Sequence, residues 1–379
     1  MLKILFVTNL PSPYRVDFFN ELGKSLKLTV FFERHFASNR DSKWKSEKAK
    51  HYIEVYSKAK PIGTDKSCGL DLIREIRKKD YDRLIISNYG SPSVMMAILY
   101  CNLFKVEYIM EHDGGFNKKD NFFKGLLKRA LLKSAAAHFT TCNEHIKYLL
   151  SIGVLQNRIF KYPFTSVHLH DVLAKPITKE EKKQIKRKLG IVEEKIILSV
   201  GQFIYRKGFD LLIEAARDMD PSIGVYIVGG VPPKEYINLR DKYMLGNVHF
   251  IDFKSKEVLR DWYCATDLFV LPTREDIWGL VINEAIANGQ PIVTTNRCIA
   301  GLELVHEEVN GFIVPSDDVA ALSNAIKYIM NNDELRKNMS LESLCIAKDY
   351  TIEAMAQWHI NLFDRMQKKD EIRHECRSL

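Results

Sequence analysis

The sequence has no long apolar run. The longest, Val94 to Phe104, falls short of the roughly 18–20 residues that cross a bilayer as a helix. The apolar start, residues 2–8, is interrupted by Asn9-Leu-Pro-Ser-Pro13 and lacks a small-residue cleavage site, so we expect a buried strand rather than a signal peptide. The seven cysteines stand singly without a Cys-x-x-Cys pair, which argues against zinc and disulfides and favours a reducing cytosol.

Motifs of two common function classes are also missing. No Gly-x-Gly-x-x-Gly follows residues 2–8 or 196–200, where the first strand of each half is expected, which disfavours a nicotinamide dehydrogenase. The positive charge alone would be compatible with a nucleic-acid-binding protein. Because no recognition motif accompanies the basic residues, we expect no nucleic-acid partner. Neither a short repeat nor a low-complexity tract is present.

What the sequence has is length, ordinary globular composition and an uneven charge. A chain of 379 residues with 46% hydrophobic and 27% charged residues predicts two domains. Residues 1–170 hold 28 Lys and Arg against 16 Asp and Glu, and the remainder holds 28 against 32. A basic first half indicates an anionic partner such as a membrane surface or a phosphorylated substrate; the alternative is a solvated, lysine-rich surface.

Short apolar runs alternate with amphipathic stretches along both halves. This alternation predicts two doubly wound, Rossmann-like α/β domains with parallel sheets, facing a central cleft that holds the active site. The rhythm breaks near 165–178, so we expect domains at 1–170 and 171–350 and a C-terminal helix and tail at 351–379. Strands are expected at 2–8, 28–32, 83–87, 106–110 and 136–140, and in the second half at 196–200, 225–228, 248–250, 268–271 and 291–294.

The first segment that indicates chemistry is Gly201-Gln-Phe-Ile-Tyr-Arg-Lys-Gly208. It follows an expected strand and places Arg206 and Lys207 beside the start of a helix. Free backbone N–H groups, the helix dipole and two cations together favour a diphosphate. The alternative is a basic turn that binds no ligand.

The second segment runs from Leu271 to Gly289. A strand leads into a polar loop that contains Asp276, Gly279 permits a close turn, and a helix is expected from about Leu280. Glu284 then lies about one turn into this helix. The two carboxylates can accept hydrogen bonds from sugar hydroxyls on either side of a phosphate held at the helix N-terminus. Otherwise they are ordinary surface charges.

Together the two segments resemble the family 4 retaining glycosyltransferases of GT-B fold, the glycosyl transferases group 1. The family pattern Gly-Arg-x4-Lys-Gly-Phe-Asp is similar to Gly201-Gln-Phe-Ile-Tyr-Arg-Lys-Gly-Phe-Asp210. The later pattern Glu-x-Phe-Gly-Leu-x3-Glu-Ala is similar to Asp276-Ile-Trp-Gly-Leu-Val-Ile-Asn-Glu-Ala285, followed by Leu302-Glu-Leu-Val305 and Asn310-Gly-Phe-Ile-Val-Pro315. The resemblance is tight over about 195–330.

The resemblance implies a role for each matching residue. Lys207 would bind the donor diphosphate, Glu284 the ribose hydroxyls and Asp276 the hydroxyls of the donor sugar. The amides of Gly279, Leu280 and Val281 would contact sugar and phosphate, and Gly201 and Gln202 would line the donor site. It also implies a UDP- or GDP-sugar as donor substrate, no cofactor and no metal, and a C-terminal helix that crosses back to the first domain.

Two departures from the pattern concern the donor site. Gln202 stands where the family has Arg, so Arg206 is expected to supply the missing cation. Asp276 stands where the family has Glu and is one methylene shorter, which should alter its contact with the sugar.

In the first domain, His112 and Asp113 follow an expected strand and should point into the cleft, where the family often has a His or an acid touching the transferred sugar. The alternative is that they cap the loop. Tyr14 and Arg15 follow the first strand in place of the family's Gly-Gly loop, so we expect one of them to face the acceptor or the phosphate.

Residues 117–133 predict a basic amphipathic helix, with Phe122, Phe123, Leu126, Leu127, Ala130 and Leu131 on one side. Its apolar stripe either packs on the sheet or contacts anionic lipid as a peripheral membrane element.

The resemblance implies a glycosyltransferase that retains the anomeric configuration. With the basic first half, it also implies a saccharide acceptor on a lipid carrier, in surface-polysaccharide assembly at the cytoplasmic face of the inner membrane. Lys207 and Arg206 would do the electrostatic work of a metal. Two alternatives stay open: a sugar-nucleotide epimerase or hydrolase of the same fold, and a degenerate transferase that acts as a binding module.

Overall fold

The computed structural model describes residues 1–379 except 36–47, 64–65, 88, 117–121 and 379; the side chains of 122–124 and 369–378 are also not described. The chain divides into two compact units. The first comprises Met1–Ser166 with Thr351–Leu379, and the second comprises Val167–Tyr350. We had expected boundaries after residues 170 and 350.

A seven-stranded parallel sheet forms the centre of the first unit. Its strand order is β3-β2-β1-β6-β7-β8-β9, so the order reverses between β1 and β6. Both faces are covered, and the strands are accordingly runs of buried apolar residues. Their bounds are β1 Lys3–Thr8, β2 Lys27–Phe32, β3 Ile53–Tyr56, β6 Arg83–Ile86, β7 Ile109–His112, β8 Ala137–Thr140 and β9 Ile159–Lys161.

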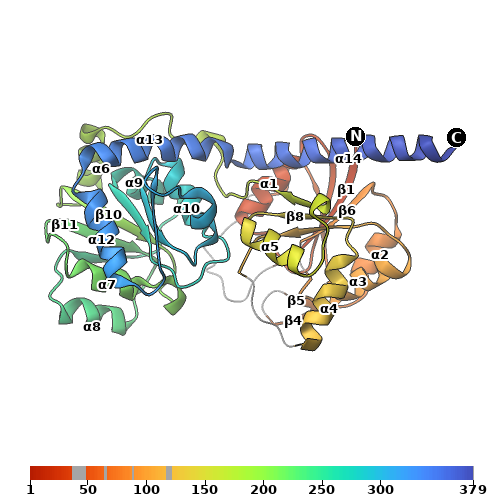
Figure 1. Ribbon diagram of the computed structural model, residues 1–379, viewed down its shortest axis with the longest axis horizontal. Coiled ribbons are helices and arrows are strands. Elements are labelled where there is room, and N and C mark those ends of the chain that lie inside the picture. Colours follow the sequence, from red (N-terminus) through yellow and green to blue (C-terminus); the bar gives the residue numbers. More distant parts are fainter. Residues whose placement is uncertain (36–47, 64–65, 88, 117–121, 379) are drawn as a thin grey trace. The chain divides into compact units, whose positions relative to one another are not determined.

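Helices connect these strands, and prolines mark where two of them begin. Pro13 and Pro92 stand in the first turns of α1 and α3, where a missing N–H costs no hydrogen bond. The long C-terminal helix α14 (Ile352–Ser378) belongs to this unit and packs along α1 (Figure 1), so the predicted return of the C-terminal helix to the first domain is confirmed. The other bounds are α1 Pro13–Gly23, α2 Asp71–Arg77, α3 Pro92–Leu103, α4 Phe122–Lys133, α5 Asn143–Ser151 and the short helix η1 Gln156–Arg158.

The predicted basic amphipathic helix corresponds to α4, although residues 117–121 lie outside the described part. Leu131 and Leu132 are buried against the rest of the unit, whereas Leu126 and Leu127 are exposed to 57% and 46%. Among the side chains of α4 that the structure describes, the apolar stripe therefore packs inward in the last turn, and its middle faces solvent.

The second unit is built on a six-stranded parallel sheet. Its order, β12-β11-β10-β13-β14-β15, is that of a dinucleotide-binding fold, with the reversal between β10 and β13. The strands are β10 Lys195–Val200, β11 Ile223–Val228, β12 Val248–Ile251, β13 Leu268–Leu271, β14 Ile292–Thr295 and β15 Gly311–Val314.

The helices around this sheet carry clear end signals. Thr178 and Glu181 form a capping box at the start of α6, and Gly190 ends that helix in the left-handed conformation. The side chains of Asp318 and Asn332 cap α12 and α13. The bounds are η2 Leu169–Asp171, α6 Lys179–Leu189, η3 Tyr205–Lys207, α7 Phe209–Ala216, α8 Lys234–Lys242, α9 Lys256–Ala265, α10 Leu280–Ala287, α11 Ile299–Leu304, α12 Val319–Met330 and α13 Asp333–Asp349.

Several short elements were not predicted. These are β3, β9, β15, α11 and the small antiparallel pair β4 (Lys60–Ile62) and β5 (Lys66–Cys68). Each has six residues or fewer, and β3, β4, β5 and β9 each include a lysine or a glutamate, so no continuous apolar run marks them. Among the described residues, no helix combines the length and apolarity needed to cross a membrane.

Candidate functional site

The loops at the reversal of the second sheet hold the residues that the sequence singled out. Ligands of open α/β sheets bind outside the carboxyl ends of the strands where the order reverses. The loop after β10 and the loop after β13 both lie there. The structure thus brings these residues to one edge of the sheet: Gly201, Gln202, Arg206 and Lys207 from the first loop, and Asp276, Gly279, Leu280, Val281 and Glu284 from the second loop and the start of α10.

An ion pair joins the two loops. Lys207 Nζ donates to Asp276 Oδ2, and Arg206 Nη1 lies 3.5 Å from Asp276 Oδ1. Asp276 is buried, and its backbone N–H donates to the carbonyl of Arg297 at 2.8 Å, which holds the carboxylate in place. Arg206 is about half exposed, whereas Gln202 is exposed and its side chain has no hydrogen bond among those the described residues make. Two cations and one carboxylate therefore meet at this point.

Two glycines allow close backbone approach at this site. A Cβ at Gly208, which has φ +68°, would lie 2.0 Å from the carbonyl oxygen of Pro272 and would force the two loops apart. Gly279 has φ +101°, and its Cβ would lie 2.9 Å from Cys298 Sγ, so a side chain there would push the second loop away from the segment after β14. The left-handed turn at Gly279 leads directly into α10, whose first residues, Leu280 and Val281, are partly exposed.

Arg274 ties the two loops together, a role that the sequence did not reveal. Its guanidinium donates to both oxygens of Asp210 at 2.8 and 2.6 Å, and its Nε donates to Asp317 Oδ1 at 2.6 Å. It also donates to the carbonyl oxygen of Tyr205 at 2.9 Å and lies 4.1 Å from the centre of the Tyr205 ring. Hydrogen bonding to Asp210 raises the pKa of Arg274, so it stays charged. This side chain fixes η3, and with it Arg206 and Lys207.

Tyr263 of α9 is a second residue that sequence reasoning missed. Its hydroxyl donates to Glu284 Oε2 at 2.8 Å, and its ring is buried against Phe269. Burial and the Glu284 carboxylate raise the pKa of Tyr263 well above its ordinary value, so the phenol stays a donor. Glu284 itself is partly exposed at the second turn of α10. Twenty-one residues and a change of element separate the pair, so no local pattern could have found it.

At the carboxyl end of β7 in the first unit, Arg15 lies buried between two acids. Its guanidinium donates to Glu111 Oε1 at 2.8 Å and to Asp113 Oδ1. The Tyr162 hydroxyl also donates to Glu111 Oε1, at 2.8 Å. Arg15 is 2% exposed, whereas the Asp113 side chain is 40% exposed, so a buried guanidinium holds a carboxylate that solvent can still reach.

Three further sequence candidates have clear places in the first unit. Tyr14, in the first turn of α1, is partly exposed and stacks edge-on against Phe164 at 5.5 Å. His112 ends β7 and is buried. Its Nε2 lies 3.1 Å from His138 Nδ1 of the neighbouring strand. Glu111, Tyr162 and His138 were not assigned from the sequence, although Glu111 stands beside two residues that were.

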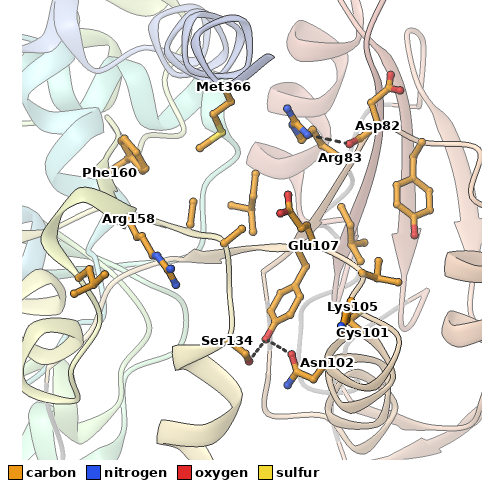
Figure 2. A pocket seen from close by; sticks show the side chains of 18 of the residues that line it. Asp82, Arg83, Cys101, Asn102, Lys105, Glu107, Ser134, Arg158, Phe160 and Met366 are labelled. Carbon is orange, nitrogen blue, oxygen red and sulfur yellow. Dashed lines mark hydrogen bonds between the residues drawn. The ribbon is translucent and has the colours of Figure 1, made fainter. Parts of the chain in front are cut away.

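A large hollow in the first unit lies at the opposite edge of the sheet. It has a volume of about 1120 Å³ and is lined by residues at the amino ends of the strands, such as Arg83, Ile109 and Phe160. Figure 2 shows Ser134 and Asn102 on one wall, and the Tyr108 hydroxyl lies within hydrogen-bonding distance of both, at 2.7 Å from Ser134 and 3.5 Å from Asn102. The candidate residues lie at the carboxyl ends, so this hollow is separate from the candidate site.

Comparison with known proteins agrees with the arrangement of the second unit. Residues 181–343 match the sequence profile of the glycosyl transferases group 1. An uncharacterized glycosyltransferase of Haemophilus influenzae is 28% identical over 293 residues, 76% of each chain. The N,N'-diacetylbacillosaminyl-diphospho-undecaprenol alpha-1,3-N-acetylgalactosaminyltransferase of Campylobacter jejuni is 24% identical over 294 residues, 75% of this chain and 77% of the relative.

A solved structure extends the comparison to both units. HepE of Anabaena, crystallised with UDP, superposes with a TM-score of 0.76 at 14% sequence identity, and the match covers 96% of this chain and all of HepE. A likeness at that identity concerns the fold. The profile match shows that residues 181–343 belong to the glycosyl transferases group 1, and both relatives are glycosyltransferases. The chain is therefore a glycosyltransferase, and its fold, with a Rossmann-like sheet in each unit, is GT-B.

Proposed function

We propose that the protein is a retaining glycosyltransferase that moves a sugar from a UDP- or GDP-linked donor to a saccharide carried on a lipid, in surface-polysaccharide assembly. The observation that carries the donor half is the meeting of Lys207, Arg206, Asp276 and Glu284 around the start of α10. Cations beside a helix N-terminus suit a diphosphate, and carboxylates suit the hydroxyls of the attached sugars.

Each residue has one task in this proposal. Lys207 and Arg206 bind the diphosphate, with the amides of Gly279, Leu280 and Val281 at the helix start. Glu284, oriented by Tyr263, accepts hydrogen bonds from the ribose hydroxyls. Asp276 is paired with the two cations in the ligand-free protein and turns to the hydroxyls of the donor sugar when the diphosphate takes those cations.

The chemical step breaks the bond between the anomeric carbon and the diphosphate oxygen. The leaving oxygen becomes negatively charged, and Lys207 and Arg206 stabilise that charge without a metal. The acceptor hydroxyl attacks from the face that the diphosphate leaves, and its proton passes to the leaving phosphate oxygen. A new glycosidic bond of retained configuration and a free nucleoside diphosphate result.

The first unit contributes the contacts to the transferred sugar and the acceptor. His112 and the outward-facing Asp113 touch the sugar, and Arg15 acts by holding Asp113 in place. Tyr14, partly exposed in the first turn of α1, faces the acceptor.

Two observations support a lipid-linked acceptor. The Campylobacter relative acts, by its name, on a sugar attached to diphospho-undecaprenol. On α4, the exposed Leu126 and Leu127 lie on the same helix as the exposed Arg129 and Lys133, and residues 1–170 carry a large excess of positive charge. Apolar side chains flanked by cations suit the interface of an anionic bilayer. We place the protein there as a peripheral enzyme at the cytoplasmic face of the inner membrane.

A donor screen followed by a transfer assay tests the enzymatic half. UDP-, GDP- and ADP-sugars are each added to the full chain, and melting temperature is recorded, since a true ligand stabilises in proportion to its saturation. The stabilising donor is then incubated with and without lipid-linked saccharides. We expect transfer only with acceptor. Epimerisation or hydrolysis without acceptor, or binding without turnover, would overturn the proposal.

Vesicle sedimentation tests the membrane half. The wild type should sediment with vesicles containing phosphatidylglycerol and remain free with purely zwitterionic vesicles. Leu126→Ser with Leu127→Ser should abolish sedimentation. The control is Val258→Ser with Leu341→Ser, which removes two comparably exposed apolar side chains from the second unit. Equal sedimentation of both double variants would contradict contact through α4.

A further inference from the structure

Three buried histidines of the first unit lie around the end of β7. The rings of His112 and His138 stack at 5.4 Å between centres, and those of His112 and His145 lie at 4.4 Å. All three are less than 9% exposed. Burial lowers the pKa of His138 and of His145 to about 4, and it lowers that of His112 well below its ordinary value. The three rings are therefore neutral at physiological pH, and each carries one ring proton.

The position of two of these protons follows from the hydrogen bonds. His138 Nε2 lies 3.1 Å from the carbonyl oxygen of Leu132, which can only accept, so Nε2 carries the proton. His138 Nδ1 is then an acceptor. His112 Nε2, at 3.1 Å from it, must carry the proton of its own ring. The remaining nitrogen, His112 Nδ1, is left with a free lone pair.

We propose that His138 is a positioning residue that fixes the tautomer of His112, so that His112 Nδ1 accepts a hydrogen bond from one hydroxyl of the transferred sugar. This assignment rests on the proposed function, in which His112 touches that sugar. In a neutral imidazole that could change its tautomer, Nδ1 would carry the proton in part of the molecules and would offer an N–H to the hydroxyl. Fixing the tautomer makes the ring a permanent acceptor at no cost during binding.

The last turn of α4 anchors this series of hydrogen bonds. The Leu132 carbonyl belongs to that turn, and the Tyr108 hydroxyl donates to the neighbouring carbonyl of Leu131 at 2.9 Å. Tyr108 therefore holds the end of α4, the end of α4 orients His138, and His138 orients His112. The helix whose middle exposes Leu126 and Leu127 thus ends in a hydrogen-bonded connection to the sugar-contacting histidine.

Imidazole ¹⁵N NMR on the full chain tests the tautomer without any need for turnover. His112 is assigned from the signal lost in His112→Gln. In the wild type its Nε2 should be protonated and its Nδ1 bare. His138→Asn places an amide oxygen near the former Nδ1 and should keep that state, whereas His138→Phe removes the acceptor and should give a mixture of tautomers. His145→Phe is the matched control, because His145 stacks on His112 without a hydrogen bond to it. In His145→Phe the tautomer of His112 should be unchanged.

Kinetics with the donor found in the screen test the consequence. Each hydroxyl of the donor sugar is replaced in turn by fluorine, which cannot donate. The wild type should lose about tenfold in kcat/KM at one position, the worth of one such hydrogen bond. In His138→Phe, kcat/KM with the natural donor should be lower than in the wild type, and fluorine at that position should cause no further loss. In His138→Asn, fluorine at that position should lower kcat/KM as much as it does in the wild type.

Two results would overturn the proposal: a proton on His112 Nδ1 in the wild type, or an unchanged tautomer and unchanged discrimination in His138→Phe. If no donor is turned over by any variant, the proposed function fails, and the NMR result still decides how His138 sets the tautomer.

Discussion

The hydroxyl of Tyr263 in α9 donates a hydrogen bond of 2.8 Å to the carboxylate of Glu284 in α10. Tyr263 is itself fixed, because the Gln290 amide donates to its carbonyl oxygen at 2.9 Å and its ring packs on Phe269. Glu284 lies partly exposed at the sheet edge where the donor nucleotide is proposed to bind. A buried, permanently protonated phenol therefore holds the carboxylate in one rotamer before any ligand arrives, and pre-ordering of this kind reduces the entropy lost on binding.

Tyr263→Phe should weaken donor binding while leaving the fold intact. The change removes one hydroxyl and no ring contact, so Glu284 loses its orientation and the cost appears in nucleotide affinity. We expect a Kd about 3- to 10-fold higher by isothermal titration, equivalent to about 0.7–1.4 kcal/mol, the net contribution of one typical hydrogen bond. Tyr328→Phe, an exposed ring on α12, is the control and should bind normally. An unchanged affinity in Tyr263→Phe would show that orientation of Glu284 by Tyr263 does not contribute to donor binding.

Arg274→Lys should loosen the loop that carries Arg206 and Lys207. An ammonium cannot reproduce the paired hydrogen bonds to Asp210 together with the bond to Asp317, nor the flat contact with the Tyr205 ring. We expect the free energy of unfolding to fall by about 1–3 kcal/mol and donor KM to rise. Arg240→Lys is the matched control.

The control tests a different environment with the same chemical change. Arg240 pairs with Asp241 on the surface of α8, where an ion pair contributes less than about 1 kcal/mol. Equal losses of stability in Arg274→Lys and Arg240→Lys, measured by chemical denaturation, would show that Arg274 is not a loop clamp.

Asp276→Asn should move nucleotide affinity and turnover in opposite directions. In the ligand-free protein Asp276 neutralises Lys207 and Arg206, and its replacement frees both cations for a diphosphate. Binding of the bare nucleoside diphosphate should tighten a few-fold, whereas kcat with the sugar donor should fall by about 10- to 100-fold because a contact to the reacting sugar is lost. Glu275→Gln, whose side chain pairs with Arg297 at 4.0 Å, is the neighbouring control. Parallel losses of both quantities would contradict this account.

The fold could be predicted from the sequence because its signals are long and repeated. Buried parallel strands are continuous apolar runs, and their alternation with amphipathic helices predicted both parallel sheets, whereas the loop motifs indicated the family. Besides the small pair β4 and β5, the strands missed were three outer ones: β3 and β9 of the first sheet and β15 of the second. Their residues are less buried, for example Ile53 at 65% exposure, so their composition resembles that of a loop.

The candidate site was predictable only where the loops carry family motifs. Lys207, Asp276 and Glu284 stand in such motifs, and their roles stay predictions. The side chains that orient them come from other elements: Tyr263 from a helix and His138 from the middle of a strand. Such contacts form because separate elements approach one another in three dimensions. A single sequence does not indicate which elements do so.

The last prediction concerns acid stability of the second unit. Asp267 accepts from Lys182 at 2.8 Å, from Lys186 at 3.0 Å and from the backbone N–H of Ile196 at 3.0 Å. Burial alone would raise the pKa of Asp267, but the two ammonium groups and these hydrogen bonds lower it below its ordinary value of 3.8. A carboxylate with a lowered folded-state pKa stabilises the protein above its unfolded-state value, and that contribution is lost as pH falls through the folded-state pKa.

Asp267→Asn should therefore destabilise the protein at neutral pH and matter progressively less in acid. At pH 7 the change leaves two largely buried ammonium groups without their anion, and we expect the free energy of unfolding to fall by about 1–3 kcal/mol. The difference from wild type should shrink once the pH falls below 3.8, where the unfolded wild-type chain takes up a proton at this site. Asp261→Asn breaks the exposed pair with Lys188 and should cost less than about 1 kcal/mol. Urea titrations of the three proteins between pH 7 and 3 measure these differences, and a gap between Asp267→Asn and wild type that stays constant over this range would mean that the lysines do not lower the pKa of Asp267.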